Sequence, residues 1–321
     1  MIARRTFIKG AAMAGIAATT SGIGARQGHA QAVPNSVGTA PPKLKAPRNA
    51  CDSHHHIYDP ARFPMPPSKG RAAPSNGTVS DYRLLQKRIG TTRSVVVQPR
   101  NYAIENEVTI DALKQLAPNS RGVVVVHPTV TDAELKQFND AGVRGIRFSL
   151  GDPATAVVKL DMIEPLAKRI ASLGWHIQFN VDGEQIVELE DLLRRLPTPL
   201  VFDHLAHPPL AEGTGHSSHR IVRSLIDKGR TWVKLSGAYS NTSVGPPSYA
   251  DATKIAQTFV KGAPERLVWG SDWPHPGLPD NNKPDDALLF DLMTEWAPDE
   301  AVRNRILVTN PEALYGFPKT V

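Results

Sequence analysis

Residues 50–57 read Ala-Cys-Asp-Ser-His-His-His-Ile, a short run that begins apolar and ends in polar side chains. Seven further short runs, rich in β-branched residues, follow it along the chain. Continuous runs of this length are typical of parallel strands that are buried on both faces of a sheet. The seven runs are Arg93–Gln98, Gly122–His127, Gly142–Ser149, Trp175–Val181, Leu200–His204, Trp232–Ser236 and Leu267–Trp269.

Amphipathic stretches lie between these predicted strands. In Leu160–Leu173, apolar residues recur every three to four positions, as on one face of a helix. Strands that alternate with helices predict an α/β fold, either a closed barrel or an open doubly wound sheet. The other helical patterns are Asp81–Ile89, Glu105–Leu116, Gln185–Leu196, His219–Ile226, Ala250–Val260 and Asp285–Trp296.

Two observations favour the barrel. No Gly-x-Gly-x-x-Gly motif follows the first predicted strand, which argues against a dinucleotide-binding open sheet. Several strands end in polar residues, and the sites of barrels form at the carboxyl ends of their strands. A barrel needs about 250 residues, and the chain has 321. We therefore predict a (β/α)8 TIM barrel over residues 50–321.

The first 32 residues predict a cleaved export signal of the twin-arginine type. Arg4-Arg5 precede Phe7-Ile8-Lys9, and a weak apolar run rich in Ala, Gly and Thr follows. Another kind of export signal with a basic start is the alternative. We expect the twin-arginine machinery to deliver the protein to a bacterial periplasm. Residues 33–49 predict a linker, and no later run of about 18 apolar residues predicts a membrane span in the mature protein.

The charge balance gives no indication of a nucleic-acid partner. The formal net charge is +6, from 37 basic and 31 acidic residues. Four of the basic residues lie in the leader, which has no acid, so 33 remain against 31 and the body carries +2. No run of Lys and Arg remains in the body. The single cysteine, Cys51, excludes an intrachain disulfide and is expected to be a small buried residue.

Three predicted strands carry a histidine or an aspartate near or just beyond their carboxyl ends. The first carries His54 and His56, which share a face because residues two apart on a strand point the same way. The sixth ends at His204, and the eighth is followed by Asp272. We expect these four side chains to form a site, with His55 facing the helices. His207 and His275 are loop residues, either at the rim or structural; the isolated His127, His176, His216 and His219 are interpreted as core or surface residues.

These motifs resemble the amidohydrolase superfamily, and within it the branch of 2-pyrone-4,6-dicarboxylate lactonase and galactarolactone isomerase. The resemblance covers roughly Lys45 to the C-terminus. The order of the His-x-His pair, the sixth-strand histidine and the eighth-strand aspartate is its specific feature. The segments that carry it are Asp52–His56, Gln98–Tyr102, Gly142–Phe148, Phe202–His204, Trp232–Gly237 and Leu267–His275.

The resemblance implies a reaction mechanism. Asp272 would be the general base that activates water, and His54, His56 and His204 would polarise the scissile carbonyl. Arg147 would bind a substrate carboxylate with its planar guanidinium, with a structural ion pair as the alternative. The other predicted substrate-binding residues are Arg100, Tyr102, Gln178, Asn180, Tyr239 and His275.

The fifth strand bears on whether a metal is used. Metal-using members of the superfamily have a histidine at the end of this strand. Here His176 lies at its start, and Gln178 and Asn180 occupy the inward positions. Neutral amides are poor zinc ligands, so we expect no metal cofactor. The alternative is one divalent ion such as zinc, held by His54, His56, His204 and Asp272.

The expected function is therefore the hydrolytic opening of a carboxylated lactone. The substrate would resemble either 2-pyrone-4,6-dicarboxylate or a sugar-acid lactone. Enzyme alternatives are a metal-dependent amidohydrolase or decarboxylase, and a lactone isomerase in which a substrate hydroxyl replaces water. A periplasmic binding protein is the non-enzyme alternative, against which the complete set of His54, His56, His204 and Asp272 argues, since binding needs no base.

Overall fold

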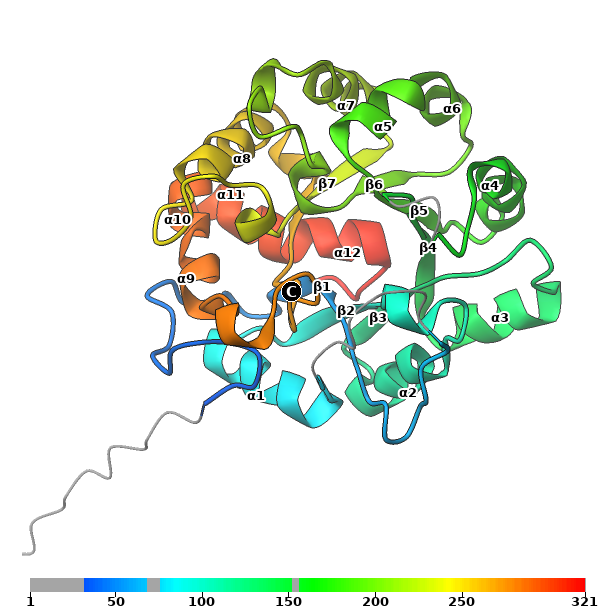
Figure 1. The fold of residues 1–321 in the computed structure, drawn as a ribbon, viewed down its shortest axis with the longest axis horizontal. Helices are drawn as coiled ribbons and strands as arrows, with labels where there is room; N and C mark the ends of the chain where they lie inside the picture. The colour runs from blue at the N-terminus through cyan, green and yellow to red at the C-terminus, as the bar shows by residue number, and fades with distance from the viewer. Residues whose placement is uncertain (1–31, 68–75, 152–155, 321) are drawn as a thin grey trace, which may run out of the picture. The chain divides into compact units, whose positions relative to one another are not determined.

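A computed structural model describes residues 32–67, 76–151 and 156–320. Eight parallel strands form one sheet in the order β1 to β8, and helices surround them (Figure 1). The fold is the predicted (β/α)8 barrel, and every predicted strand is present, with ends that differ by at most three residues. The strands are β1 (Cys51–His55), β2 (Arg93–Val97), β3 (Ser120–Val124), β4 (Val143–Ser149), β5 (His176–Asn180), β6 (Leu200–Phe202), β7 (Thr231–Leu235) and β8 (Leu267–Trp269).

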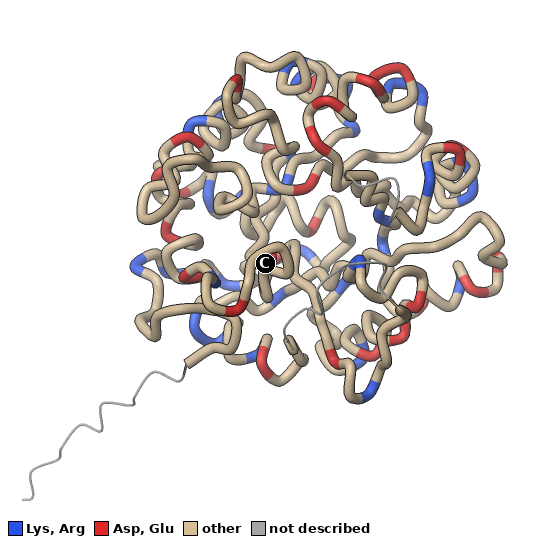
Figure 2. Tube along the Cα trace, in the orientation of Figure 1, with Lys and Arg blue, Asp and Glu red and all other residues tan. Residues whose placement is uncertain are grey.

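The helices pack their apolar faces on the outside of the barrel. Two predicted helices are each divided in the structure: one breaks at Leu189 and the other at Leu292. The α-helices are α1 (Val79–Ile89), α2 (Glu107–Leu116), α3 (Asp132–Asp140), α4 (Ile163–Ala171), α5 (Gly183–Glu188), α6 (Glu190–Arg195), α7 (Ser217–Asp227), α8 (Ala250–Gly262), α9 (Asp286–Asp291), α10 (Met293–Trp296), α11 (Glu300–Asn304) and α12 (Asn310–Tyr315). Basic and acidic residues are interspersed along them (Figure 2).

The seam between β1 and β8 closes the barrel just beyond the end of β8. There Asp272 N donates to His54 O at 2.8 Å, and His56 N donates to Trp273 O at 2.8 Å. Gly270 allows this approach, since a Cβ at this position would lie 2.5 Å from His54 Cβ. The seam therefore brings the end of the first strand and the end of the last one together.

The opposite end of the barrel is filled by the C-terminal segment. Tyr315 and Phe317 pack against apolar residues of the strands and form one buried cluster with them. Arg93 Nη2 donates to Pro318 O at 2.6 Å, and Arg121 Nη2 donates to Gly316 O at 2.9 Å. Cys51 is buried in this cluster, as predicted, and burial raises the pKa of its thiol to about 12. Side chains thus fill this end of the barrel. The other end, where the strands have their carboxyl ends, is the one available for a site.

The segment before β1 is irregular but lies against the barrel, whereas its composition predicts a linker. Val33 is buried, and Pro34 O accepts a hydrogen bond from Trp273 Nε1 at 2.7 Å. Leu44 N donates to Asp291 Oδ1 at 2.8 Å. The predicted export signal falls almost wholly on residues 1–31, outside the described residues. Among the described helices, none has the length and apolar character to span a membrane.

Candidate active site

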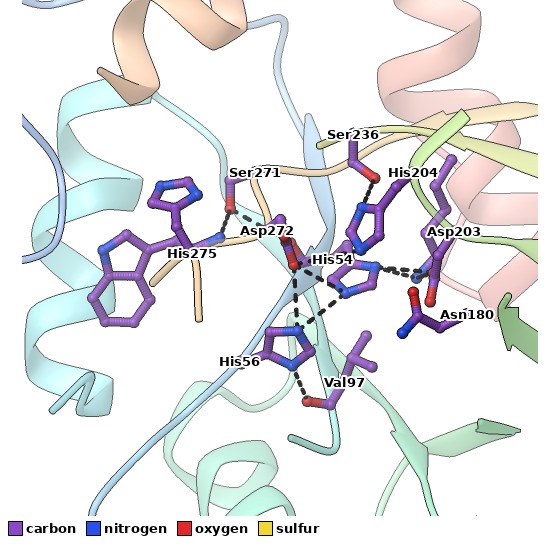
Figure 3. A network of polar contacts seen from close by, with 12 residues as sticks. His54, His56, Val97, Asn180, Asp203, His204, Ser236, Ser271, Asp272 and His275 are labelled. Atoms are coloured by element: carbon purple, nitrogen blue, oxygen red, sulfur yellow. Dashed lines mark hydrogen bonds and ion pairs between the residues drawn. The ribbon is translucent and has the colours of Figure 1, made fainter. Parts of the chain in front are cut away.

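The structure brings together the four predicted residues at the carboxyl ends of β1, β6 and β8 (Figure 3). Asp272 Oδ1 lies 3.4 Å from His54 Nε2, 3.3 Å from His56 Nε2 and 3.8 Å from His204 Nε2. All four side chains are buried. His55 lies on the other side of the strand, stacked on Tyr82 of α1, as strand alternation predicts. Residues from the seam between β1 and β8 and from the end of β6 therefore form one buried cluster around the Asp272 carboxylate.

Uncommon backbone conformations hold two members of this cluster. Asp272 has φ 61° and His204 has φ 48°, a left-handed region that residues other than glycine rarely adopt. Such strain is found at functional sites when the surrounding structure enforces it. Gly237 lies against His204, and a Cβ at this glycine would be 2.8 Å from His204 Nδ1. The turn after β7 can therefore approach His204 this closely because residue 237 is a glycine.

Hydrogen bonds orient the rings. His56 Nδ1 lies 2.8 Å from Val97 O, which can only accept, so this nitrogen carries a proton. In a neutral His56, the Nε2 lone pair then faces Asp272. His204 Nδ1 lies 2.9 Å from Ser236 Oγ, which can donate or accept. Asp272 Oδ2 accepts from the Tyr239 hydroxyl, and Asp272 Oδ1 accepts no hydrogen bond from the described residues.

The charge states follow from burial and from neighbouring charges. Burial alone would raise the pKa of Asp272, but the imidazoles of His204, His56 and His54 hold it well below its usual value. Burial lowers the pKa of His54 well below its usual value, and the Lys234 ammonium lowers it further. Burial also lowers the pKa of His204. The cluster is therefore an ionised Asp272 carboxylate beside the imidazoles of His54 and His204, which favour the neutral state.

The same donor atoms fit a divalent cation. His54 Nε2 and His56 Nε2 lie 3.2 Å apart, and each lies within 3.4 Å of Asp272 Oδ1. Tetrahedral zinc with bonds of about 2.0–2.2 Å separates its ligands by roughly 3.3–3.6 Å. The Asp272 oxygen without a hydrogen bond also suits a metal ligand. His54, Asp203 and His204 form a second possible group, but the Lys234 ammonium, 3.8 Å from Asp203 Oδ1, disfavours a cation there.

A cavity of about 350 Å³ opens above the cluster. Its wall contains seven residues of the predicted site: His56, Arg100, Arg147, Asn180, His204, Tyr239 and Asp272. Tyr58, Asn101, His207, Ser240, Pro276 and Gly277 complete it. The cavity therefore has a carboxylate at its base, guanidinium groups in its wall, and hydroxyl and amide groups between them.

Four other predicted site residues do not line this cavity. His54 is fully buried beneath Asp272. Gln178 lies two positions before the end of β5, too deep to reach the cavity, and hydrogen-bonds within the barrel. The Tyr102 hydroxyl accepts from Asp59 N at 3.1 Å, and His275 turns toward Asp286 of α9, with Nε2 and Oδ2 3.1 Å apart. The prediction that Tyr102, Gln178 and His275 contact substrate is therefore not supported by their positions.

Arg147 makes the structural ion pair that was one of its two interpretations, and it also lines the cavity. Its Nε donates to Asp203 Oδ2 at 3.0 Å, and its Nη2 lies 3.0 Å from the same oxygen. The guanidinium is also part of the cavity wall. The structural ion pair is thus present and holds the guanidinium at the edge of the cavity.

Sequence reasoning missed two charged residues below the cavity, Asp203 and Lys234. Both side chains are fully buried. Burial lowers the pKa of Lys234 to about 8. Lys234 Nζ donates to Ser53 O at 2.9 Å and to Gln178 Oε1 at 2.8 Å. A lysine within the apolar run Trp232–Ser236 is the signal that could have revealed it, since a buried lysine needs partners.

Comparisons with known sequences show which family the chain belongs to. The family model described as Amidohydrolase matches residues 51–317, and the chain belongs to this family, as the motifs predict. It is 33% identical to 2-pyrone-4,6-dicarbaxylate hydrolase of Comamonas testosteroni, covering 87% of this chain and 94% of that protein. It is 34% identical to 4-sulfomuconolactone hydrolase of Rhizobium radiobacter, with coverage of 87% and 93%. It is 31% identical to D-galactarolactone isomerase of Agrobacterium fabrum, with coverage of 87% and 94%.

A solved structure shows the same fold. The apo crystal structure of an Agrobacterium tumefaciens protein superimposes with a TM-score of 0.80 at 29% identity, covering 89% of this chain and 99% of that one. The family model and the relatives place the chain among amidohydrolase-family enzymes, in the branch of lactone hydrolases and a lactone isomerase.

Proposed function

We propose that this enzyme hydrolyses the ester bond of a carboxylated lactone. The observation that carries the proposal is one cavity with the Asp272 carboxylate at its base and the Arg100 and Arg147 guanidiniums in its wall. A base and an anion-binding group in the same cavity suit an anionic substrate that is attacked by water. Two of the related hydrolases are named for a pyrone dicarboxylate and a sulfomuconolactone, which supports an anionic lactone.

In the proposed reaction, Asp272 accepts a proton from a water molecule. The water oxygen attacks the lactone carbonyl, the ring C–O bond breaks, and the proton passes to the leaving alkoxide. His204 can stabilise the oxyanion, because Ser236 can donate to its Nδ1 and leave Nε2–H directed at the cavity. His56 can do so as an imidazolium, because Val97 already accepts its Nδ1–H. His54 lies too deep for direct contact and instead supports Asp272 from below.

The remaining cavity residues suit the other parts of such a substrate. Arg147 would bind a carboxylate with the guanidinium edge that faces the cavity, and Arg100 would assist it. Asn180, Tyr239 and Ser240 offer amide and hydroxyl groups for ring or hydroxyl oxygens. A pyrone dicarboxylate and a sugar-acid lactone both fit this description.

A metal-dependent hydrolase is the second candidate, favoured by the convergence of the donor atoms around Asp272 Oδ1. His54, His56, His204 and Asp272 would hold a divalent ion, which would act as a Lewis acid on the carbonyl. Elemental analysis of the purified protein, and activity before and after chelation, separate the two candidates. Activity that survives complete metal removal supports the metal-free reaction, and activity restored only by an added ion supports the metal-dependent one.

A lactone isomerase is the third candidate, favoured by the relative that is 31% identical. The same base would then deprotonate a substrate hydroxyl instead of water. A panel of carboxylated lactones and their neutral analogues, assayed by acid release and by product analysis, tests all these functions. A ring-opened acid supports hydrolysis, and a second lactone of equal mass supports isomerisation. Binding without any turnover across the panel would support a binding protein instead.

We also propose export by the twin-arginine route to a periplasm. The support is the Arg4-Arg5 pair followed by Phe7-Ile8-Lys9. Fractionation of cells that produce the full chain tests this proposal. Protein found only in the cytoplasm of a host with an active twin-arginine pathway would contradict it.

A further inference from the structure

Asp203 lies where the cavity wall meets the buried histidines. It follows β6 directly and is fully buried. Its Oδ2 accepts from Arg147 Nε at 3.0 Å and from Gln178 Nε2 at 3.1 Å. Its Oδ1 lies 3.1 Å from His54 Nδ1. One carboxylate thus contacts both a guanidinium of the cavity wall and the imidazole beneath Asp272.

Neighbouring residues fix the orientation of this carboxylate. Lys234 Nζ donates to Gln178 Oε1 at 2.8 Å, so the amide of Gln178 must direct its NH2 group at Asp203. Lys234 Nζ also lies 3.2 Å from His54 Nδ1. All these side chains are buried in a close-packed interior, where a change at one contact is passed to the next.

We propose that Asp203 is a positioning residue that couples the binding of a substrate anion at Arg147 to the placement of His54 against Asp272. This inference rests on the proposed function, in which Arg147 binds the anion. An anion that binds in the cavity partly neutralises the Arg147 guanidinium. The attraction between Arg147 and Asp203 is then weaker. Asp203 then interacts more strongly with His54, because electrostatic contacts are strong in a buried site.

The coupling has a consequence for substrate selection. A neutral lactone leaves the Arg147 guanidinium paired with Asp203, so the interaction between Asp203 and His54 stays as it is without substrate. An anionic lactone strengthens that interaction. The enzyme would therefore distinguish anionic from neutral substrates in kcat as well as in KM.

Nuclear magnetic resonance of the full chain with 15N-labelled histidine tests the coupling without turnover. The His54 signals are assigned by their absence in His54→Gln. The probes are isophthalate, a dicarboxylate with no hydrolysable ester, and isophthalamide, its neutral analogue. We expect saturating isophthalate to shift the His54 ring-nitrogen resonances, and isophthalamide to leave them unchanged.

In Asp203→Asn, the His54 response to saturating isophthalate should disappear although isophthalate still binds, because removing the Asp203 carboxylate breaks the link to His54 but leaves the Arg147 guanidinium charged. Asp132→Asn is the matched control, since Asp132 pairs with Arg169 on the surface, and it should behave as the wild type. If Asp203→Asn does not fold, Arg147→Lys replaces it and should reduce the response, because lysine cannot make both guanidinium contacts.

Three results would overturn the inference: a His54 response of wild-type size in the folded variant, no response in the wild type, or no isophthalate binding by the wild type. The readout does not depend on lactone hydrolysis. Failure of every lactone in the activity panel would contradict the proposed function and leave this coupling to be judged on its own result.

Discussion

Gly270→Ala should damage the site by forcing apart the two strands that form it. A Cβ at this position would lie 2.5 Å from His54 Cβ and 2.8 Å from His54 N. Carbon atoms in contact prefer about 3.5–4.0 Å, so His54 or residue 270 must move by about 1 Å. His54 Nε2 lies only 3.4 Å from Asp272 Oδ1, and Asp272 follows Gly270 by two residues. The displacement therefore falls directly on the contact between His54 and Asp272.

The expected losses of activity and of stability follow from the size of this displacement. A misplacement of about 1 Å in an active site lowers the rate roughly 10²-fold. Overpacking of a close-packed interior lowers the free energy of unfolding by about 1–3 kcal/mol. In a protein of this size, such a loss lowers Tm by roughly 1–5 °C. We expect kcat to fall far more than stability does.

The assay compares kcat on a lactone that the wild type hydrolyses with Tm from thermal unfolding. Gly215→Ala is the matched control, since no atom of the described residues lies within 4 Å of a Cβ built there. It should keep wild-type kcat and Tm. Wild-type kcat in folded Gly270→Ala would refute the reasoning that the close approach of β1 and β8 sets the site.

Three further predictions concern the anion, export and the metal. Arg147→Met should raise KM for a carboxylated lactone by about 10–100-fold, and Arg147→Lys by less, because lysine keeps the charge but loses the planar fork; equal, negligible effects in steady-state kinetics would make Arg147 purely structural. Replacing Arg4 and Arg5 by lysine should retain the protein in the cytoplasm, and unchanged periplasmic accumulation in fractionated cells would contradict the twin-arginine signal. In the metal-free reaction, exhaustive chelation should leave kcat unchanged; a loss that only zinc or another divalent ion restores would establish the metal-dependent alternative.

The barrel and the position of its site could be predicted because both depend on local patterns. Parallel strands buried on both faces are short and apolar, and their carboxyl ends meet at one end of the barrel. His54, His56, His204 and Asp272 each lie at or just after a strand end, so strand order alone brings them together. His55 faces the helices because side chains alternate along a strand.

The directions of loop side chains could not be predicted in this way. His275 turns toward Asp286, and the Tyr102 hydroxyl meets the backbone of Asp59; both contacts depend on how separate loops pack. Asp203 and Lys234 carry charge inside the barrel. Only the folded structure shows the partners that allow them to be buried.

Asp272→Asn is the most direct test of the central claim that Asp272 is the general base. The amide is nearly isosteric and can still accept from Tyr239, but it cannot accept a proton from water. General-base catalysis contributes about 10²–10⁴ in rate. We therefore expect kcat on a confirmed lactone to fall by this factor, with isophthalate binding and Tm retained and with no change in metal content. A folded, metal-free Asp272→Asn enzyme with undiminished kcat would contradict the account.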